Sequence, residues 1–399
     1  MYMYWNYHNK PSIENILTYE DCQLAYNHYL KVTGKAPISV SGWDVDKNVH
    51  LPYSILNKTL SSIEKDINTY YLVEEDIGNT IISDYVFSHV GISIHPKNIL
   101  IGGSATALLS LVLLALTAQG AQPLVLEPSY YTVHDILTLI NQRYLSIPIS
   151  FPDLTYDYDA IERAIKEENI RIIVLTDPIW GSGIAIGQNN YLKIVSIANK
   201  YQCTLIADLA RMGLQWDGPD EPLLGEYLDC ICKSERYAVV YSPCKKLFAN
   251  GVKTGVLISS ENVMQQIHGY SDSFLGSISA AQASFLTCLF SKESSAYASS
   301  QIIKNSRLAK EHYDILNTLL YSTEWILLCP QMGHYALTAL PSNGVSERDM
   351  FSQILNSAGV FTMPMGLYGI RCDSHYWFRV NLLMNLDSLI DAMEHILLL

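Results

Sequence analysis

Short apolar runs alternate with helical stretches through the middle of the chain, and this alternation constrains the fold more than any other feature of the sequence. The runs are short and rich in β-branched residues: Ile99–Ile101, Pro123–Leu126, Ile170–Leu175, Thr204–Ala207, Ala238–Tyr241 and Val256–Ile258. Such alternation is typical of a mostly parallel sheet whose faces are covered by helices. We therefore predict an α/β fold for this region.

The rest of the chain predicts a second, smaller lobe. After Ile258 two helical stretches, about Glu261–Leu289 and Ser299–Leu320, lead into short strands near Tyr335–Leu340 and Trp377–Leu382. A chain of 399 residues is long enough for two domains. We expect an N-terminal arm and part of the small domain in residues 1–49, a large domain in 50–285 and a small α+β domain in 286–399.

Composition narrows the range of partners. The formal net charge of −13 argues against nucleic acid, because binding to a phosphate backbone requires clustered Lys and Arg. The longest apolar run, Ala107–Ala118, is shorter than the ~20 residues of a membrane span. The start of the chain does not resemble a secretory signal, so we expect a cytoplasmic protein. Cys230 and Cys232 lack the spacing of a zinc knuckle, which predicts free thiols and no metal.

Unusual residues follow the apolar runs, at the strand ends where ligands gather in open α/β sheets. In chain order these segments are Gly102–Thr106, Glu127–Tyr130, Asp177–Gly183, Asp208–Arg211 and Ser242–Lys245. Their order and spacing resemble the class I/II aminotransferases of pyridoxal-phosphate (PLP) fold type I, from about Pro52 to the C-terminus. The resemblance implies an aspartate-aminotransferase-like fold, in which a mostly parallel seven-stranded sheet forms the large domain.

Lys245 and Asp208 carry the catalytic roles that this resemblance implies. The family pattern is Ser-x-Ser-Lys with an Arg eight residues after the Lys, and this chain has Ser242, Lys245 and Lys253 at those positions. Lys245 would hold PLP as a Schiff base and act as the base at the substrate Cα, with the adjacent Lys246 as a competing candidate. Asp208 would pair with the pyridinium nitrogen; a helix cap is the structural alternative.

Other residues match the cofactor-binding positions of the family. Ser104, Ala105 and Thr106 open an apolar helix, whose N-terminus offers unpaired N–H groups to a phosphate, although a Gly-Gly-Ser turn is also a common structural feature. Tyr130 would stack on the cofactor ring unless it is an ordinary core tyrosine. Tyr70 or Tyr71 resembles the tyrosine that reaches the phosphate of a neighbouring subunit, which implies a homodimer.

Substrate-binding candidates lie near the two ends of the chain. Arg379 is a lone charge in a short apolar strand, the context of the family's carboxylate-binding arginine, and an interdomain salt bridge is the alternative. Gly42 and Trp43, followed by Asp44, stand where the family often closes over its substrate. A plain loop with an Asp turn explains this segment equally well.

Three residues depart from the family pattern. Trp180 stands in place of an Asn, and Arg211 in place of a Tyr, that both donate to the phenolic oxygen of PLP. We expect both contacts to be lost, which leaves deprotonation at Cα possible and allows the later steps to differ from transamination. Arg211 would place a fixed positive charge beside that oxygen and alter the Schiff-base pKa. Lys253 replaces an Arg that binds the phosphate through two parallel hydrogen bonds. A lysine would still neutralise the phosphate, but only as a point charge.

These observations leave three functional hypotheses. The first is an aminotransferase that acts at the Cα of an L-amino acid through an external aldimine. The second is a non-transaminating PLP enzyme of specialised metabolism, which would carry out elimination, replacement, cyclisation or oxidation on a polar amino acid such as an arginine derivative. The third is a non-catalytic regulator, which the acidic N-terminal segment disfavours because no basic helix-turn-helix precedes the fold.

Overall fold

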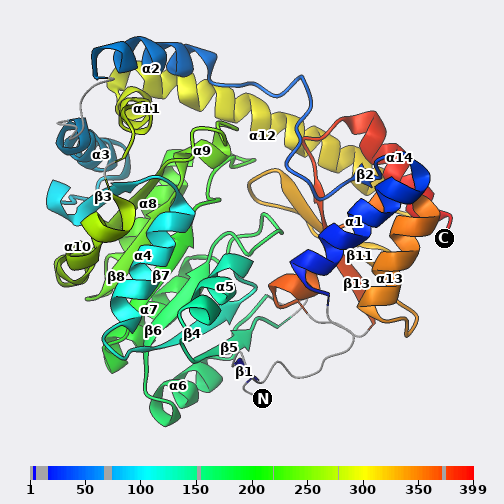
Figure 1. Ribbon diagram of the computed structural model, residues 1–399, viewed down its shortest axis with the longest axis horizontal. Helices are drawn as coiled ribbons and strands as arrows, with labels where there is room; N and C mark the ends of the chain where they lie inside the picture. Colours follow the sequence, from blue (N-terminus) through cyan, green and yellow to red (C-terminus); the bar gives the residue numbers. More distant parts are fainter. Residues whose placement is uncertain are drawn as a thin grey trace. The chain divides into compact units, whose positions relative to one another are not determined.

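The computed structural model describes residues 3–5, 17–66, 74–150, 154–218, 220–276, 278–370 and 374–399 (Figure 1). The chain divides into two compact units. Unit 1 is built from Met1–Asn9, His50–Asp177 and Ile186–Lys304, and unit 2 from Lys10–Val49, Pro178–Ala185 and Asn305–Leu399. These units follow from internal packing, whereas the domain bounds expected from the sequence stay a prediction.

Unit 1 contains the predicted mostly parallel sheet. Its seven main strands lie in the order β5-β4-β6-β7-β8-β9-β3, and β1 (Met3–Trp5) adds an antiparallel strand beside β5. Only β9 runs against the other main strands. The bounds of the seven strands are β3 Ile99–Gly102, β4 Gln122–Glu127, β5 Tyr144–Pro148, β6 Ile170–Thr176, β7 Thr204–Leu209, β8 Tyr237–Tyr241 and β9 Gly255–Ser259. The sheet confirms the predicted α/β fold with a mostly parallel seven-stranded sheet.

Helices connect and cover these strands. They are α2 Tyr53–Asp66, α3 Glu74–Val90, α4 Ala105–Thr117, α5 Tyr131–Leu139, α6 Tyr158–Glu167, α7 Gln188–Tyr201, α8 Asp220–Ile231, α9 Pro243–Lys246, α10 Glu261–Leu275 and α11 Ala280–Phe290. The long helix α12, Lys292–Leu320, begins in unit 1 and continues into unit 2. The segment expected as one helix over Glu261–Leu289 is two helices. Gly276 ends α10 with a φ of +60°, and Ser279 starts α11 with a capping box.

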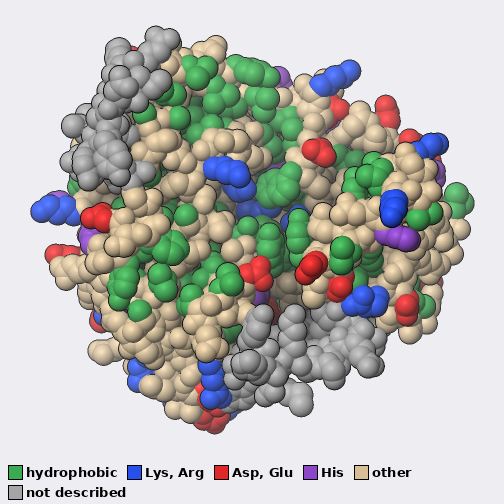
Figure 2. All heavy atoms as spheres, viewed as in Figure 1, with side chains coloured by type: hydrophobic (Ala, Val, Ile, Leu, Met, Phe, Trp, Pro, Cys, Tyr) green, Lys and Arg blue, Asp and Glu red, His purple; other side chains and the backbone are tan. Residues whose placement is uncertain are grey.

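The apolar run at Ala107–Ala118 is a buried core helix. α4 packs against β8, β9, α5 and α10, and its leucine and valine side chains, except that of Leu114, are buried in the main hydrophobic cluster of unit 1. In the described part of the chain, no helix is long and apolar enough to cross a membrane. On the face shown in Figure 2, basic side chains are interspersed with acidic and uncharged ones rather than gathered in one stripe.

Unit 2 is a smaller α+β unit. The strands β10 (Ile326–Leu327), β11 (Tyr335–Pro341) and β13 (His375–Asn381) form an antiparallel sheet, and β12 (Val360–Phe361) pairs with β2 (Ile38–Ser39) in parallel. The bounds of its other helices are α1 Tyr19–Thr33, α13 Glu347–Gln353 and α14 Leu386–Leu397.

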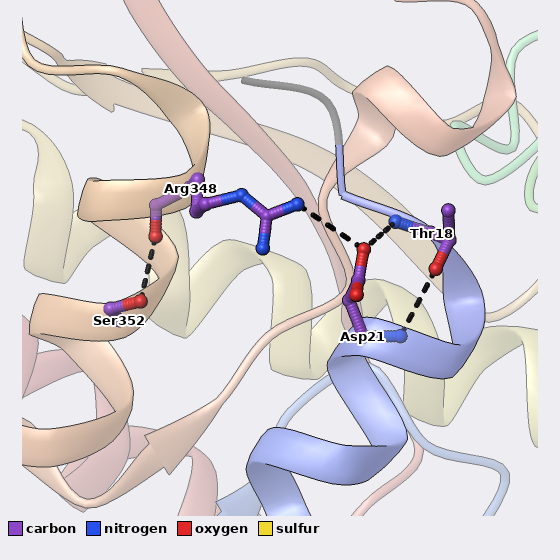
Figure 3. A network of polar contacts seen from close by, with 4 residues as sticks. All are labelled: Thr18, Asp21, Arg348 and Ser352. Carbon is purple, nitrogen blue, oxygen red and sulfur yellow. Dashed lines mark hydrogen bonds and ion pairs between the residues drawn. The ribbon is translucent and has the colours of Figure 1, made fainter. Parts of the chain in front are cut away.

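A polar network ties the start of α1 to α13 within unit 2 (Figure 3). The Asp21 carboxylate accepts hydrogen bonds from Thr18 N–H at 2.9 Å and from the Arg348 guanidinium at 3.3 Å, while Thr18 Oγ1 accepts from Asp21 N–H at 3.1 Å. Thr18 and Asp21 thus form a capping box at the start of α1, and Arg348 links this box to α13.

Candidate active site

The carboxyl end of the parallel sheet aligns three residues of neighbouring strands. Thr176 of β6 pairs with Asp208 of β7, which pairs with Val240 of β8. Parallel strands end at a common edge, so the residues that follow them in sequence converge there. Asp208 is the charged member of this row, as the sequence predicted for a strand-ending carboxylate.

Asp208 is a buried carboxylate with an altered pKa. Burial raises its pKa to about 6, and this rise is opposed by a hydrogen bond from Ala210 N–H to Oδ1 and by the positive charges of Arg211 and Lys245. A buried carboxylate beside cations is suited to hold a positively charged ring nitrogen, because the charges stabilise each other where water is excluded.

Lys245 lies on the one-turn helix α9 that follows β8. Its pKa is lowered to about 8, mainly because burial disfavours the ammonium form and next because the Arg211 guanidinium repels it. Lys253 also lowers this pKa, whereas the charges of Cys244 and Asp208 raise it. An amine with such a pKa is partly neutral near pH 7, as a nucleophile and a base must be.

The neighbouring Lys246 has different surroundings. It is 9% exposed, and its Nζ lies 5.6 Å from the centre of the Tyr241 ring. Successive residues of a helix point about 100° apart, so only one of the two lysines can face Asp208 and Arg211. The charges that act on Lys245 are those of the candidate site, which supports Lys245 as the cofactor lysine.

The segment expected to hold a phosphate is packed tightly against β9. Ser104 caps α4, its Oγ accepting from Ala107 N–H at 3.0 Å, and Ala105 and Thr106 form the first helical residues. A Cβ on Gly255 would lie 2.7 Å from Ala105 N, so only glycine fits there. The N-terminal turn of α4 therefore rests directly on the backbone of β9, which fixes the direction of its N–H groups.

Ser242 and Lys253 lie on the connection between β8 and β9. Ser242 Oγ donates to Thr254 O at 3.1 Å, and Thr254 Oγ1 donates to Gly102 O at 3.4 Å. Lys253 is exposed and has a φ of +49°, a left-handed conformation that is uncommon outside glycine. Gln282 of α11 donates to Lys253 O at 3.0 Å and to Gly103 O at 3.2 Å, and so joins this connection to the turn before α4.

Tyr130 lies at the start of α5. Its N–H donates to Thr176 Oγ1 at 3.3 Å, which ties Tyr130 to the end of β6. The residue is half-buried, and its ring meets that of Tyr131 edge to face at 4.9 Å. Tyr70, predicted to reach a partner's phosphate, and its alternative Tyr71 lie outside the described residues.

Arg379 is a buried cation in the β-sheet of unit 2. It is 4% exposed, and its Nε and Nη2 both donate to Ser41 O, at 3.3 and 3.2 Å. Nη1 is buried and has no hydrogen-bond partner, and across the described ranges no carboxylate forms an ion pair with this arginine. A buried guanidinium nitrogen without a partner is a strong candidate for binding an external carboxylate.

Aromatic rings surround this guanidinium. Its Cζ lies 4.6 Å from the ring centre of Tyr335, 5.7 Å from that of Trp180 and 5.8 Å from that of Tyr368. Within unit 2, Trp180 therefore lies against Arg379. Its place beside the phenolic oxygen of the cofactor, which the resemblance implied, stays a prediction.

Gly42 and Trp43 lie next to Arg379 in the same unit. Gly42 O accepts hydrogen bonds from the Tyr335 hydroxyl at 2.8 Å and from Asn381 Nδ2 at 3.2 Å. The Trp43 ring is 39% exposed and meets Tyr335 edge to face at 5.9 Å. The segment that the sequence left open as a plain loop is thus anchored beside the candidate carboxylate-binding residue.

The candidate residues form two groups. Lys245, Asp208, Arg211 and Lys253 act on one another in unit 1, and Arg379, Trp180, Gly42 and Trp43 gather in unit 2. Sequence reasoning missed the residues that hold these groups in place. They are Thr176, Thr254 and Gln282 in unit 1, and Ser41, Tyr335, Tyr368 and Asn381 in unit 2. A sequence signal existed only for Thr176 and Asn381, the polar ends of two apolar strands.

Comparisons with known proteins agree with this geometry. A family model described as aminotransferase class I and II matches residues 66–396. A histidinol-phosphate aminotransferase of Chlorobaculum parvum is 24% identical over 171 residues, which cover 43% of this chain and 45% of that protein. 1-Aminocyclopropane-1-carboxylate synthase 2 of Cucurbita pepo is 25% identical over 228 residues, with coverage of 54% and 45%. The matches span less than half the length of these two curated relatives.

The fold also matches solved structures. Substrate-bound BacF from Bacillus subtilis has a TM-score of 0.80 and 17% identity, with 97% of each chain covered. At this identity the likeness shows the fold. The match of the family model over most of the sequence shows more: the chain belongs to the aminotransferase class I and II family, whose members are PLP-dependent transferases.

Proposed function

We propose that this protein is a PLP-dependent aminotransferase that acts at the Cα of an L-amino acid. The observation that carries the proposal is Lys245, an amine with a pKa near 8 that interacts electrostatically with Asp208 and Arg211 at the carboxyl edge of the sheet. Structural lysines on protein surfaces have pKa values near 10.4 and need no such surroundings.

The residues of unit 1 fit the chemical groups of PLP. Asp208 offers a buried carboxylate to the ring nitrogen, and Lys245 offers a partly neutral amine to the aldehyde. The first turn of α4, with Ser104, offers N–H groups to the phosphate, and Lys253 offers a positive charge. PLP, when bound, supplies an electron sink for the charge left at the substrate Cα.

Each residue then has a defined task. Asp208 keeps the proton on the ring nitrogen, and Lys245 accepts the proton from the substrate Cα and returns it at a later step. The Arg211 charge favours the neutral form of Lys245. Arg379 binds the substrate α-carboxylate through the part of its guanidinium that Ser41 leaves unused.

Absorbance and turnover test the proposal in sequence. Purified protein incubated with PLP and then desalted is expected to keep an absorbance band near the visible edge. Lys245→Ala removes this band, and Lys246→Ala, the matched control, keeps it. Loss of the band in Lys246→Ala alone would move the role to Lys246, and a band of equal intensity in both variants would overturn the assignment.

Incubation with pools of amino acids identifies the reaction. Transamination consumes an amino acid only when a 2-oxo acid is present to accept the amino group, and a new amino acid then appears in equal amount. Loss of substrate without an acceptor, with ammonia release or ring formation, would overturn the aminotransferase in favour of an elimination or cyclisation enzyme. Mass analysis of the pools reads out both outcomes.

We also propose that the active form is a homodimer, as the resemblance implies for Tyr70 or Tyr71. Sedimentation gives the mass in solution. Mixing Lys245→Ala with Tyr70→Phe, and separately with Tyr71→Phe, tests whether active sites are shared. Activity recovered on mixing supports a tyrosine from the partner, and monomeric active protein would overturn this proposal.

A further inference from the structure

Tyr335 contacts two parts of unit 2 that are far apart in sequence. Its ring lies under the Arg379 guanidinium, with 4.6 Å between the ring centre and Cζ. Its hydroxyl donates to Gly42 O at 2.8 Å, and its ring packs edge to face against Trp43 at 5.9 Å. Tyr335 itself is 3% exposed, so these contacts determine where its side chain lies.

The Ser41–Trp43 segment in turn orients Arg379. Ser41 O accepts from both Nε and Nη2, which occupies one edge of the planar guanidinium. Of the five N–H donors of an arginine, the remaining ones lie on Nη1 and on the outer side of Nη2. These two nitrogens form the end of the fork, the geometry that accepts a carboxylate through two parallel hydrogen bonds.

Asn381 reinforces the same arrangement. Its side-chain amide donates to Gly42 O at 3.2 Å and to Asp44 O at 2.7 Å, and Asn381 pairs with Tyr335 across the sheet. The strands β11 and β13 therefore hold the segment after Ser41 from two neighbouring positions. Ser41 is also held by its own side chain, because its Oγ donates to Arg379 O at 2.5 Å and accepts from Met363 N–H at 2.9 Å. The direction of the Ser41 carbonyl therefore depends on these contacts together with those of Tyr335 and Asn381.

The Tyr335 ring also stabilises the buried charge. A guanidinium that is 4% exposed and has no counterion among the described residues is costly to bury. An aromatic face close to the cation offsets part of this penalty, and it does so without occupying the donors that a substrate needs. A carboxylate at the same place would occupy those donors instead.

We propose that Tyr335 is a positioning residue for substrate binding. It holds the Ser41–Trp43 segment and Arg379 in one arrangement, so that the unused end of the guanidinium faces the α-carboxylate of the amino acid. This inference rests on the proposed function, because it assigns Arg379 to the substrate carboxylate. It adds that binding of the carboxylate and the place of the Ser41–Trp43 segment are coupled through one side chain.

Binding of a pair of unreactive probes tests the inference on the PLP-loaded protein. The probes are 3-phenylpropanoate and its primary amide, which lack an amino group and differ in the carboxylate. Calorimetry or displacement titration gives the ratio of their dissociation constants. Wild-type protein is expected to bind the acid more tightly than the amide. In Tyr335→Leu the ratio of the two dissociation constants should fall roughly 10- to 30-fold, the range expected when a cation loses a desolvated aromatic partner.

Tyr335→Phe separates the two contacts of the tyrosine. It keeps the ring under Arg379 and loses the hydrogen bond to Gly42 O, so a smaller, severalfold loss of acid preference is expected. Steady-state kinetics with an amino-acid substrate should show the same order, as a raised KM with a less affected kcat. Binding of the amide is expected to stay unchanged in both variants.

Tyr376 provides matched controls on the neighbouring strand. It is 2% exposed, and its hydroxyl shares a hydrogen bond with Thr362 at 2.6 Å. Tyr376→Phe and Tyr376→Leu remove a buried hydroxyl and a buried ring from the same sheet. They are expected to lower the melting temperature while leaving the preference for the acid intact.

The outcomes distinguish this inference from the proposed function. If wild-type protein does not prefer the acid, the carboxylate role of Arg379 is wrong and the inference falls with it. If wild-type protein prefers the acid and Tyr335→Leu keeps that preference, the inference alone is overturned. An equal loss in the Tyr335 and Tyr376 variants would show a general effect of destabilising the sheet and would also overturn it.

Discussion

Replacement of Arg211 by Gln is expected to raise the pKa of Lys245. The pKa of Lys245 is about 8, against an ordinary value of 10.5, and the Arg211 charge is the second cause of this lowering after burial. At pH 7 about one Lys245 side chain in eleven is neutral, against about one in 3,000 for a lysine of pKa 10.5, a difference of roughly 300-fold in reactive amine.

The rate at which cofactor-free protein takes up PLP reports this neutral fraction. Stopped-flow absorbance over pH 6 to 10 should show a rate that rises with pH and levels off above a midpoint near 8. Arg211→Gln moves the midpoint upward, and each upward shift of the midpoint by half a pH unit slows PLP uptake at pH 7 about threefold. The midpoint stays below 10.5, because burial acts in the variant too.

Asp208→Asn provides a control of opposite sign. The Asp208 charge raises the pKa of Lys245, so its removal moves the midpoint downward. A wild-type midpoint near 10 would refute the electrostatic reasoning about Lys245. A downward shift in Arg211→Gln, or an upward shift in Asp208→Asn, would show that these side chains do not act on Lys245 through their charges.

Three further predictions concern other parts of the molecule. Burial raises the pKa of Asp177 to about 7, so the folded state binds a proton at this carboxyl more tightly than the unfolded chain does. The unfolding free energy therefore falls as pH rises from about 4 to 7, by up to about 1.4 kcal/mol per pH unit. Asp177→Asn should remove this part of the pH dependence in denaturant titrations, and equal slopes of unfolding free energy against pH in both proteins would contradict it. Gly255→Ala places a Cβ 2.7 Å from Ala105 N, so it should lower the unfolding free energy by about 1–3 kcal/mol and weaken PLP binding. Gly269→Ala is the control: Gly269 lies in helix α10 and its added Cβ would meet nothing within 4 Å, so this variant should have a slightly higher melting temperature. Arg379→Lys keeps the positive charge and loses the paired donors of the guanidinium, so we expect a KM raised at least tenfold with kcat less affected. An unchanged KM would exclude Arg379 from substrate binding.

The sheet was predictable from the sequence because its signals are local. Each of the six apolar runs named from the sequence became a strand, since a parallel strand buried on both faces is a short apolar run. β5 lacks that signal, because its five residues, Tyr144–Pro148, include a serine and a proline. The break between α10 and α11 depends on Gly276, and an isolated glycine in a helical pattern is often tolerated.

The candidate site was predictable only in part. Asp208 and Lys245 follow apolar strands, and parallel strands deliver such residues to one edge of a sheet. The eight-residue spacing to Lys253 favoured Lys245 over Lys246, but the packing of Lys246 against Tyr241 is a tertiary contact that no spacing reveals. The pairing of Tyr335 with Asn381 depends on strand register between segments about 40 residues apart, and register follows from tertiary packing.

Two of the three departures from the family pattern act on different charged residues. Arg211 lowers the pKa of Lys245 in unit 1, and Trp180 lies against Arg379 in unit 2. An amine that must both accept and return a proton works best when its pKa lies near the working pH, because each transfer is then close to balanced. Transamination requires both transfers at one lysine. The charge at Arg211 is therefore compatible with the proposed aminotransferase, even though the residue differs from the tyrosine that the family pattern has there.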